Sequence, residues 1–237
     1  MKITTTQVTP DIWMFTFAAG QSYAVRSRDG WSLVDTGLPG HAEPLLDELA
    51  RLGARPQDVR DIVLTHFHMD HAGSAADLAA ATGARVLAGA GDAPFIRGER
   101  PGPPPVLEDW EVPLYESVHA NLRDVPPVPP CPVDRELTDG DTLQWGEETV
   151  RVIAVPGHTP GSIALHLTPS RVLFTGDTIA RHPDVMLGVF NTDRRQAVAS
   201  FHRQCALDVQ TACFGHGAPL TGNAGPALRA AAERLPA

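Results

Sequence analysis

Four apolar, β-type runs in this chain end in glycine-containing turns that carry histidine or aspartate. The runs are DIVL, VRVIAV, RVLFT and TACFG, and the turns are HFHMDHAG, PGHTPGS, GDT and GHG. In α/β sheets, ligand and catalytic sites assemble at the carboxyl edge of the strands. Four such coincidences predict one functional site and favour a fold that brings these strand ends together.

Runs of branched and aromatic residues alternate with stretches of helical periodicity along most of the chain. Strands are expected at 13–17, 31–35, 61–65, 150–155, 162–167, 171–175 and 211–215, and helices at 41–53, 73–83, 193–207 and 224–235. This alternation is typical of an α/β protein in which helices cover the faces of sheets.

Residues 101–132 break the pattern, because they hold ten of the 22 prolines. Proline is excluded from helix interiors and central strands, so a long irregular excursion is expected. The segment also carries Trp110, Leu114 and Tyr115, more apolar material than a disordered linker usually has. We interpret residues 94–132 as a flap, with an interdomain linker as the alternative.

Composition disfavours several classes of partner. The net charge of −9 disfavours a surface for nucleic acid or anionic lipid. No secretory signal and no membrane-spanning stretch are evident. The three cysteines lack metal-type spacing, which favours reduced thiols in the cytoplasm. A cytoplasmic protein that acts on a small molecule is therefore expected.

The stretch HFHMDH predicts a metal site. His66 and His68 are two residues apart, so on an extended strand end they point the same way. Asp70 and His71 follow where the chain turns into a helix. A solvated, histidine-rich turn is the alternative, but the other strand ends supply more of the imidazole and carboxylate groups that zinc binds. These groups are His158, Asp177 and His216.

Together with LVDTG at 33–37, the motifs THFHMDH, PGHTPGS, FTGDT and GHG resemble those of the metallo-β-lactamase superfamily of metallohydrolases. The resemblance runs from about Val8 to Ala218. It implies an α/β protein with an αββα sandwich, in which two facing mixed sheets are flanked by helices. A single domain over residues 1–237 is expected.

The resemblance also implies a ligand set for two metal ions. It assigns His66, His68 and His158 to one ion, Asp70, His71 and His216 to the other, and Asp177 to a bridge between them. Asp35 is implied to support the loop that holds the ligands, a role consistent with its carboxylate. Two zinc ions are expected, with iron or manganese as alternatives.

The expected chemistry is metal-dependent hydrolysis. Two neighbouring cations lower the pKa of a bridging water to give a hydroxide, and they stabilise the negative charge that develops on the substrate. Asp70 is the candidate to orient this hydroxide or pass a proton to the leaving group. Candidates for substrate contact are Trp110, Tyr115 and His182. The remaining histidines are interpreted as structural.

A small ester or lactone, bound under the flap, is the expected substrate. In this superfamily exported β-lactamases lack the bridging Asp, and glyoxalase II carries a helical domain after its last metal histidine, where 21 residues follow here. Homoserine-lactone lactonases have a tyrosine after the bridging-Asp motif; none stands there in this chain, although Tyr23 or Tyr115 would substitute from elsewhere.

Several alternatives remain open. They are a thioester or phosphodiester hydrolase, an iron-dependent persulfide dioxygenase on the same scaffold, and a binding module without activity. The apolar residues of the flap would, in another interpretation, cover the interface of a homodimer.

Overall fold

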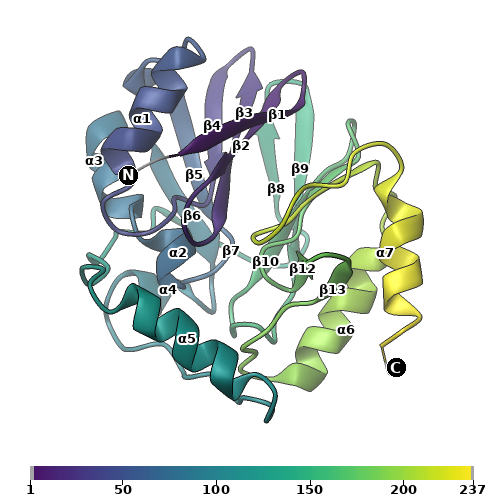
Figure 1. The fold of residues 1–237 in the computed structure, drawn as a ribbon. Coiled ribbons are helices and arrows are strands. Elements are labelled where there is room, and N and C mark those ends of the chain that lie inside the picture. The colour runs from purple at the N-terminus through teal and green to yellow at the C-terminus, as the bar shows by residue number, and fades with distance from the viewer. Residues whose placement is uncertain (1–2, 236–237) are drawn as a thin grey trace.

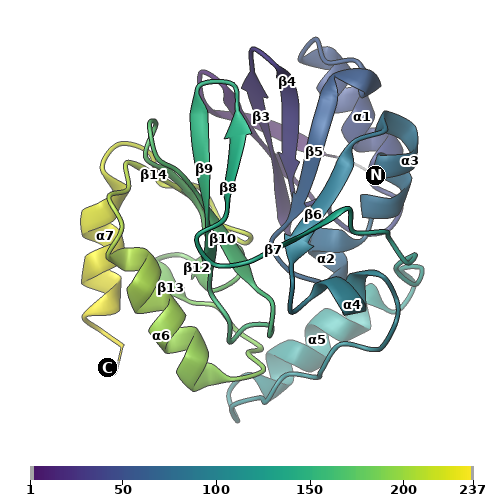
Figure 2. The same cartoon turned by 180° about the vertical axis from the view of Figure 1, so that it is seen from behind.

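The structure is a computed structural model that describes residues 3–235, and its elements form four layers. Two β-sheets face each other, and helices cover their outer faces (Figures 1 and 2). One sheet carries α1 (Ala42–Arg51) and α3 (Ala75–Thr82), and the other carries α6 (Arg194–Cys205) and α7 (Ala224–Ala232). This αββα sandwich confirms the predicted fold class.

The first sheet has seven strands in the order β1 to β7. Strands β1 to β4 pair antiparallel, and β4 to β7 pair parallel. Their bounds are Thr4–Thr9, Ile12–Thr16, Gln21–Ser27, Gly30–Val34, Val59–Leu64, Arg85–Gly89 and Arg135–Leu137. The sheet is therefore mixed.

The second sheet is also mixed and has five strands in the order β14-β11-β10-β9-β8. Only β11 and β14 run parallel. From β8 to β11 and then β14, the bounds are Thr142–Trp145, Glu148–Ala154, Ile163–Leu167, Val172–Phe174 and Thr211–Cys213. A short ribbon of β12 (Ile179–Arg181) and β13 (Val185–Leu187) follows β11. Each of the seven predicted strands overlaps an observed strand.

Three apolar cores hold the four layers together, and β5 shows why its sequence is apolar throughout. Val63 lies in the core between the sheets, where it joins Leu165 and Phe174 of the second sheet. Its neighbours Ile62 and Leu64 lie in the core under α1 and α3. A strand that is covered on both faces needs apolar side chains on both, and so it shows no polar alternation. A third core lies under α6 and α7.

The prediction that residues 101–132 are irregular is wrong for their central part. Helix α5 (Val112–Leu122) occupies this part, after the short helix α4 (Ala93–Ile96). Pro113 lies in the first turn of α5, where no backbone N–H is needed. The ends of the segment lie together, since Cys131 N donates to Ile96 O at 2.9 Å. α5 extends across one end of the sandwich from the α4 side toward α6 (Figures 1 and 2).

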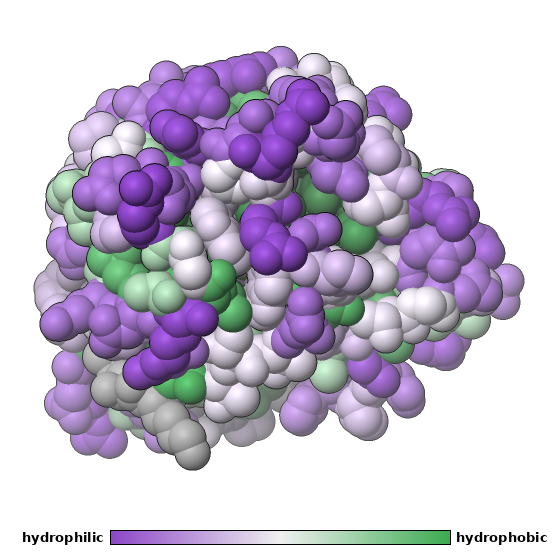
Figure 3. All heavy atoms as spheres, turned by 90° about the horizontal axis from the view of Figure 1, so that it is seen from above, coloured by the Kyte–Doolittle hydropathy of each residue, from purple (hydrophilic) through white to green (hydrophobic). Residues whose placement is uncertain are grey.

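Exposed apolar surface is concentrated on this segment. Within the described residues, the large apolar side chains that are exposed are Val106, Trp110, Val112 and Leu114. The opposite end of the sandwich, seen from above in Figure 3, presents mainly hydrophilic residues. Among residues 3–235, no helix combines the length and the apolar character that a membrane crossing requires.

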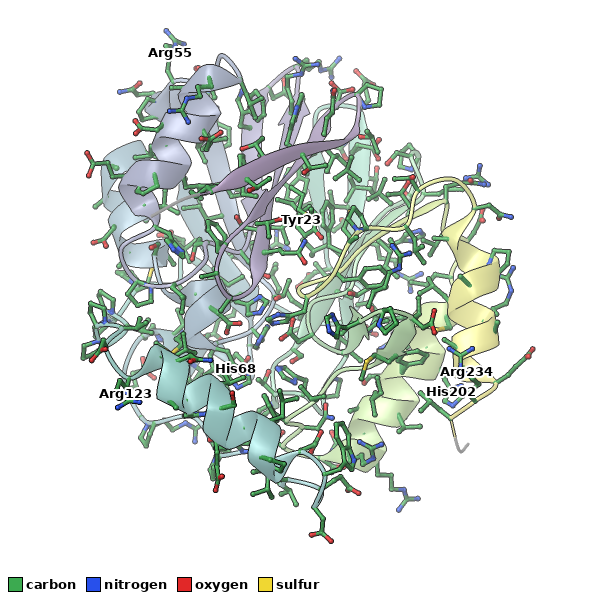
Figure 4. The ribbon with its side chains drawn as sticks, in the orientation of Figure 1. Tyr23, Arg55, His68, Arg123, His202 and Arg234 are labelled. Atoms are coloured by element: carbon green, nitrogen blue, oxygen red, sulfur yellow. The ribbon has the colours of Figure 1, made fainter. Side chains whose placement is uncertain are left out.

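Tyr23 on β3 connects the two sheets through a buried hydrogen bond. Its side chain lies in the interior (Figure 4), and its hydroxyl donates to the carbonyl oxygen of Phe214, just after β14, at 2.6 Å. We expect Tyr23→Phe to lower the free energy of unfolding by about 1–3 kcal/mol, because it leaves a buried carbonyl unpaired. Urea denaturation measures this loss. Tyr115→Phe on the partly exposed α5 is the control; an equal loss in both variants would contradict the assignment.

Candidate metal centre

Seven side chains of metal-ligand type converge at one end of the sandwich. Four follow β5, in the turn after Leu64 and in the short helix α2 (Met69–Ala72); the other three follow β9, β11 and β14. Figure 4 labels one of them, His68, toward the α5 end. In each of three groups the ligand atoms lie within 4.8 Å of one another, and the groups are His66, His68 and His158; His66, His71 and Asp177; and Asp70, His71 and His216.

The first group consists of three imidazoles. Nδ1 of His68 lies 3.1 Å from Nε2 of His66 and 3.0 Å from Nε2 of His158. Burial lowers the pKa of His66 and of His158, and it lowers the pKa of His68 to about 3. All three rings are therefore neutral near pH 7, the state in which imidazole binds a metal.

The second group combines imidazole with carboxylate. Nε2 of His216 lies 3.2 Å from Oδ2 of Asp70 and 3.1 Å from Oδ2 of Asp177. The Asp177 charge raises the pKa of His216 to about 10. The same Asp177 oxygen lies 3.7 Å from Nε2 of His158, in the first group. The Asp177 carboxylate thus stands between the two groups, where a bridging ligand would stand.

These donor atoms fit a pair of divalent cations. Among the described residues, Nε2 of His71 and Oδ1 of Asp177 are buried without a hydrogen-bond partner. Buried polar atoms rarely lack a partner, and a cation between the groups would supply one. The backbone leaves room for this arrangement at Gly215, where a Cβ atom would lie 1.9 Å from Oδ1 of Asp177.

Asp35 determines which nitrogen of His71 is free. Its Oδ2 lies 2.9 Å from Nδ1 of His71. A carboxylate only accepts, so Nδ1 donates and Nε2 keeps its lone pair for a ligand bond. Asp35 adopts the left-handed conformation, with φ 62°, which aspartate tolerates better than most residues.

Thr65 fixes in the same way which nitrogen of His66 is free to bind a metal. Thr65 was not identified from the sequence as a functional residue. Its backbone N–H donates to Oδ1 of Asp35 at 2.7 Å, and its hydroxyl donates to Oδ2 at 2.8 Å. The hydroxyl oxygen then accepts from Nδ1 of His66 at 3.0 Å, which leaves Nε2 of that ring free. The feature of the sequence that could have indicated this role is the position of Thr65 between the apolar run DIVL and His66.

The predicted substrate residues do not join this cluster. Trp110 is 52% exposed, and His182 is exposed in the turn after β12. Tyr115 is partly buried on α5, with its ring 5.2 Å from that of Phe190. Tyr23 is buried, its hydroxyl is bonded to Phe214, and burial raises its pKa, so it cannot take the part of a lactonase tyrosine.

Comparison with known proteins identifies the family. The family model of the metallo-β-lactamase superfamily matches residues 16–216. A hydroxyacylglutathione hydrolase of Fuscovulum blasticum is 34% identical over 176 residues, which are 74% of this chain and 54% of that protein. A protein of Bacillus subtilis (strain 168) named "Probable metallo-hydrolase YflN" is 27% identical over 210 residues, 80% of this chain and 76% of that protein. The chain therefore spans only about half the length of the first of these relatives.

Solved structures show the same fold. A metallo-β-lactamase from Cronobacter sakazakii, a mutant of its HARLDQ motif, superimposes with a TM-score of 0.71 at 26% identity, covering 91% of this chain and 81% of that one. BJP-1, a subclass B3 metallo-β-lactamase of Bradyrhizobium japonicum, superimposes with a TM-score of 0.70 at 25% identity. The match covers 97% of this chain and 90% of that one. The chain belongs to the metallo-β-lactamase superfamily.

Asp177→Ala tests the bridge. We expect the wild-type protein to hold about two equivalents of divalent metal and the variant to lose at least one of them together with its hydrolytic activity, because both groups lose a shared ligand. Elemental analysis after dialysis measures the content. Asp35→Ala should do less, with affinity or activity about 10–100-fold lower. Unchanged metal content and activity in Asp177→Ala would show that the centre is assembled differently.

Proposed function

We propose that the protein hydrolyses a small thioester or oxygen ester, lactones included, at a centre that holds two divalent cations. The observation that carries this proposal is the position of Asp177 between two groups of ligands. Zinc is the proposed metal, with iron or manganese as alternatives, because imidazole and carboxylate together suit zinc.

The side chains divide the work of the reaction. His66, His68 and His158 would hold one cation, and Asp70, His71 and His216 the other, with Asp177 in contact with both. When bound, the cations would activate a water molecule and polarise the carbonyl of the substrate.

Asp70 is placed to handle the proton. Its side chain is 18% exposed, so it lies at the solvent side of the cluster, unlike the fully buried His71. From there its carboxylate can orient a water molecule, accept the proton that this water loses on attack and pass it to the leaving group.

A cysteine nucleophile does not fit this protein. Cys131, Cys205 and Cys213 are buried. Burial raises the pKa of the Cys131 thiol to about 11 and that of Cys205 to about 12. The thiolate is the reactive form, and it would be scarce at neutral pH. This supports water rather than a thiol as the attacking group.

The relatives support acyl transfer to water, and they favour a thioester. The relative from Fuscovulum blasticum, which is 34% identical, is named as a hydroxyacylglutathione hydrolase. The match covers only 54% of that protein, so the proposal for this chain extends to the thioester and not to glutathione. An oxygen ester or lactone remains part of the proposal because the exposed apolar residues of the flap suit an uncharged acyl group.

The flap, residues 94–132, contacts two segments that neighbour the ligands. Gly102 packs on the ring of Phe67, which stands between two ligands in the sequence; a Cβ at Gly102 would lie 2.3 Å from that ring. Oε1 of the buried Glu111 accepts from the backbone N–H of Phe190 at 3.1 Å, in the loop where Thr192 N donates to the carbonyl oxygen of His158. We propose that the flap covers the acyl part of the substrate and excludes bulk water.

A panel of substrates tests the reaction class. We expect the zinc-loaded protein to hydrolyse short acyl thioesters, aryl esters or lactones, and to leave a phosphodiester and a β-lactam intact. A chelator should abolish the activity, and added zinc should restore it. Asp177→Ala is the negative control, which measures hydrolysis that does not depend on the metal centre. Cleavage of the phosphodiester alone, or oxygen uptake with a persulfide by iron-loaded protein, would overturn the proposal in favour of a nuclease or a dioxygenase.

Two flap variants separate substrate binding from dimerisation. We expect Tyr115→Ala to change the ratio of kcat/KM between long and short acyl substrates, because Tyr115 packs on Phe190 beside the centre. Trp110→Ala tests the alternative of a dimer interface, because the exposed side chain of Trp110 would be covered in such an interface. Metal content and mass by light scattering are measured for both. A dimer that dissociates in Trp110→Ala, with substrate preference unchanged in both variants, would assign the flap to an interface.

A further inference from the structure

Asp92 is a buried carboxylate at the start of α4 whose side chain does not cap that helix. It stands at the N-cap of α4 and is 0% exposed. Aspartate at this position usually accepts a hydrogen bond from the first turn of the helix. Here the side chain makes no such bond, although the backbone carbonyl accepts from Phe95 and Ile96. The carboxylate is therefore available to other segments.

Its two oxygens bind the two turns that carry the three-imidazole group. Oδ2 accepts from the backbone N–H of Phe67 at 3.0 Å, and Phe67 stands between His66 and His68. The same oxygen accepts from the hydroxyl of Thr159, the residue after His158, at 2.6 Å. Oδ1 accepts from the backbone N–H of Gly161 at 2.7 Å. The turn with His66 and His68 follows β5 of the first sheet, and the turn with His158 connects β9 and β10 of the second sheet.

The backbone is shaped to let this carboxylate approach. A Cβ at Gly161 would lie 2.0 Å from the backbone nitrogen of Asp92, and a Cβ at Gly89 would lie 2.0 Å from the carbonyl oxygen of Gly161. Only glycine fits such distances. Ser162 completes the turn, because its hydroxyl oxygen accepts from Thr159 N at 3.0 Å.

Keeping a carboxylate in this place is costly, so its partners matter. Burial raises the pKa of Asp92 to about 6, while its bonds to Thr159, Gly161 and Phe67 act in the opposite direction. A buried charge is tolerated only where hydrogen bonds compensate for the lost water. Phe67 alone connects Asp92 to the His66–His68 turn, and Thr159 and Gly161 together connect it to the His158 turn.

We propose that Asp92 is a positioning residue that holds the His66–His68 turn and the His158 turn at the separation in which three imidazoles can share one cation. Asp92 touches no ligand ring and acts through the backbone and Thr159. It should therefore set the affinity of the three-imidazole group and have little effect on the group of Asp70, His71 and His216. This inference concerns metal capture and holds whichever substrate the protein hydrolyses.

Asp92→Asn tests the role with little change of shape. The amide keeps one acceptor but turns its NH₂ toward a backbone donor, so at least one of the bonds that hold the two turns is lost. The affinity of each group for zinc is measured by competition with a chromophoric chelator, in a His216→Ala background that isolates the three-imidazole group and in a His68→Ala background that isolates the other. We expect affinity about 10–100-fold lower in the first background and nearly unchanged in the second.

Asp61→Asn is the matched control. Asp61 is also a buried carboxylate and lies on β5, which leads to the ligand turn, but it accepts from Arg85 and from Trp145 and contacts no ligand turn. Its zinc affinity should equal that of the parent protein. Equal losses in Asp61→Asn and Asp92→Asn, or equal losses in the two backgrounds, would reduce the effect to general destabilisation and overturn the proposal. Unchanged affinity in Asp92→Asn would do the same.

A second pair of variants covers the case in which Asp92→Asn does not fold. Thr159→Val removes the hydroxyl and keeps the shape, whereas Thr159→Ser keeps the hydroxyl. The valine variant should bind zinc more weakly than the serine variant in the His216→Ala background. Equal affinities would contradict a link through Asp92. No substrate is used, so this test stands apart from the proposed reaction.

Discussion

The structure depends on bringing seven polar side chains from two separate sheets to one point, where three of the imidazoles are fully buried. His66 is 1% exposed, His71 0% and His158 2%. Removing such groups from water is unfavourable unless each finds a partner. The partners come from other ligands, from Asp35 through its bonds to His71 and Thr65, and from the cations that the donor set fits. Folding of the loops and capture of metal are thus linked.

The facing sheets must be held in a fixed relation for this convergence to occur. Apolar contacts between them supply attraction, but such contacts tolerate small displacements better than hydrogen bonds do. Buried polar bonds that cross the interface restrict it, among them the bond from Ile163 N to Thr65 O at 2.9 Å. Tyr23 donates to Phe214 near the centre, and Nε1 of Trp145 donates to Oδ2 of Asp61 at 3.1 Å nearer the other end of β5. Asp92 adds a further connection at the ligand turns themselves.

The seven candidate ligands could be predicted because each follows an apolar run closely, and the structure brings them together. The sandwich was implied by the resemblance to the superfamily, and the structure confirms it. The helix α5 was missed because proline was counted over the whole of 101–132. Only Pro113 falls in the helix, and no proline stands between it and Pro126. Thr65, Asp92 and Glu111 were missed for another reason. A single polar residue in a loop has no periodicity, and its partners are up to 79 residues away in the chain.

Membership of the superfamily accounts for the centre but not for the substrate. Proteins named as β-lactamases share this fold at 25–26% identity, and a protein named as a thioester hydrolase is 34% identical. A shared fold carries different reactions when the surroundings of the centre differ. In this chain the flap adjoins the ligand segments, because its buried Glu111 contacts the 188–192 loop and its Gly102 packs on Phe67. Under the proposed function, the ligands keep one geometry while the flap determines which acyl group fits beside them.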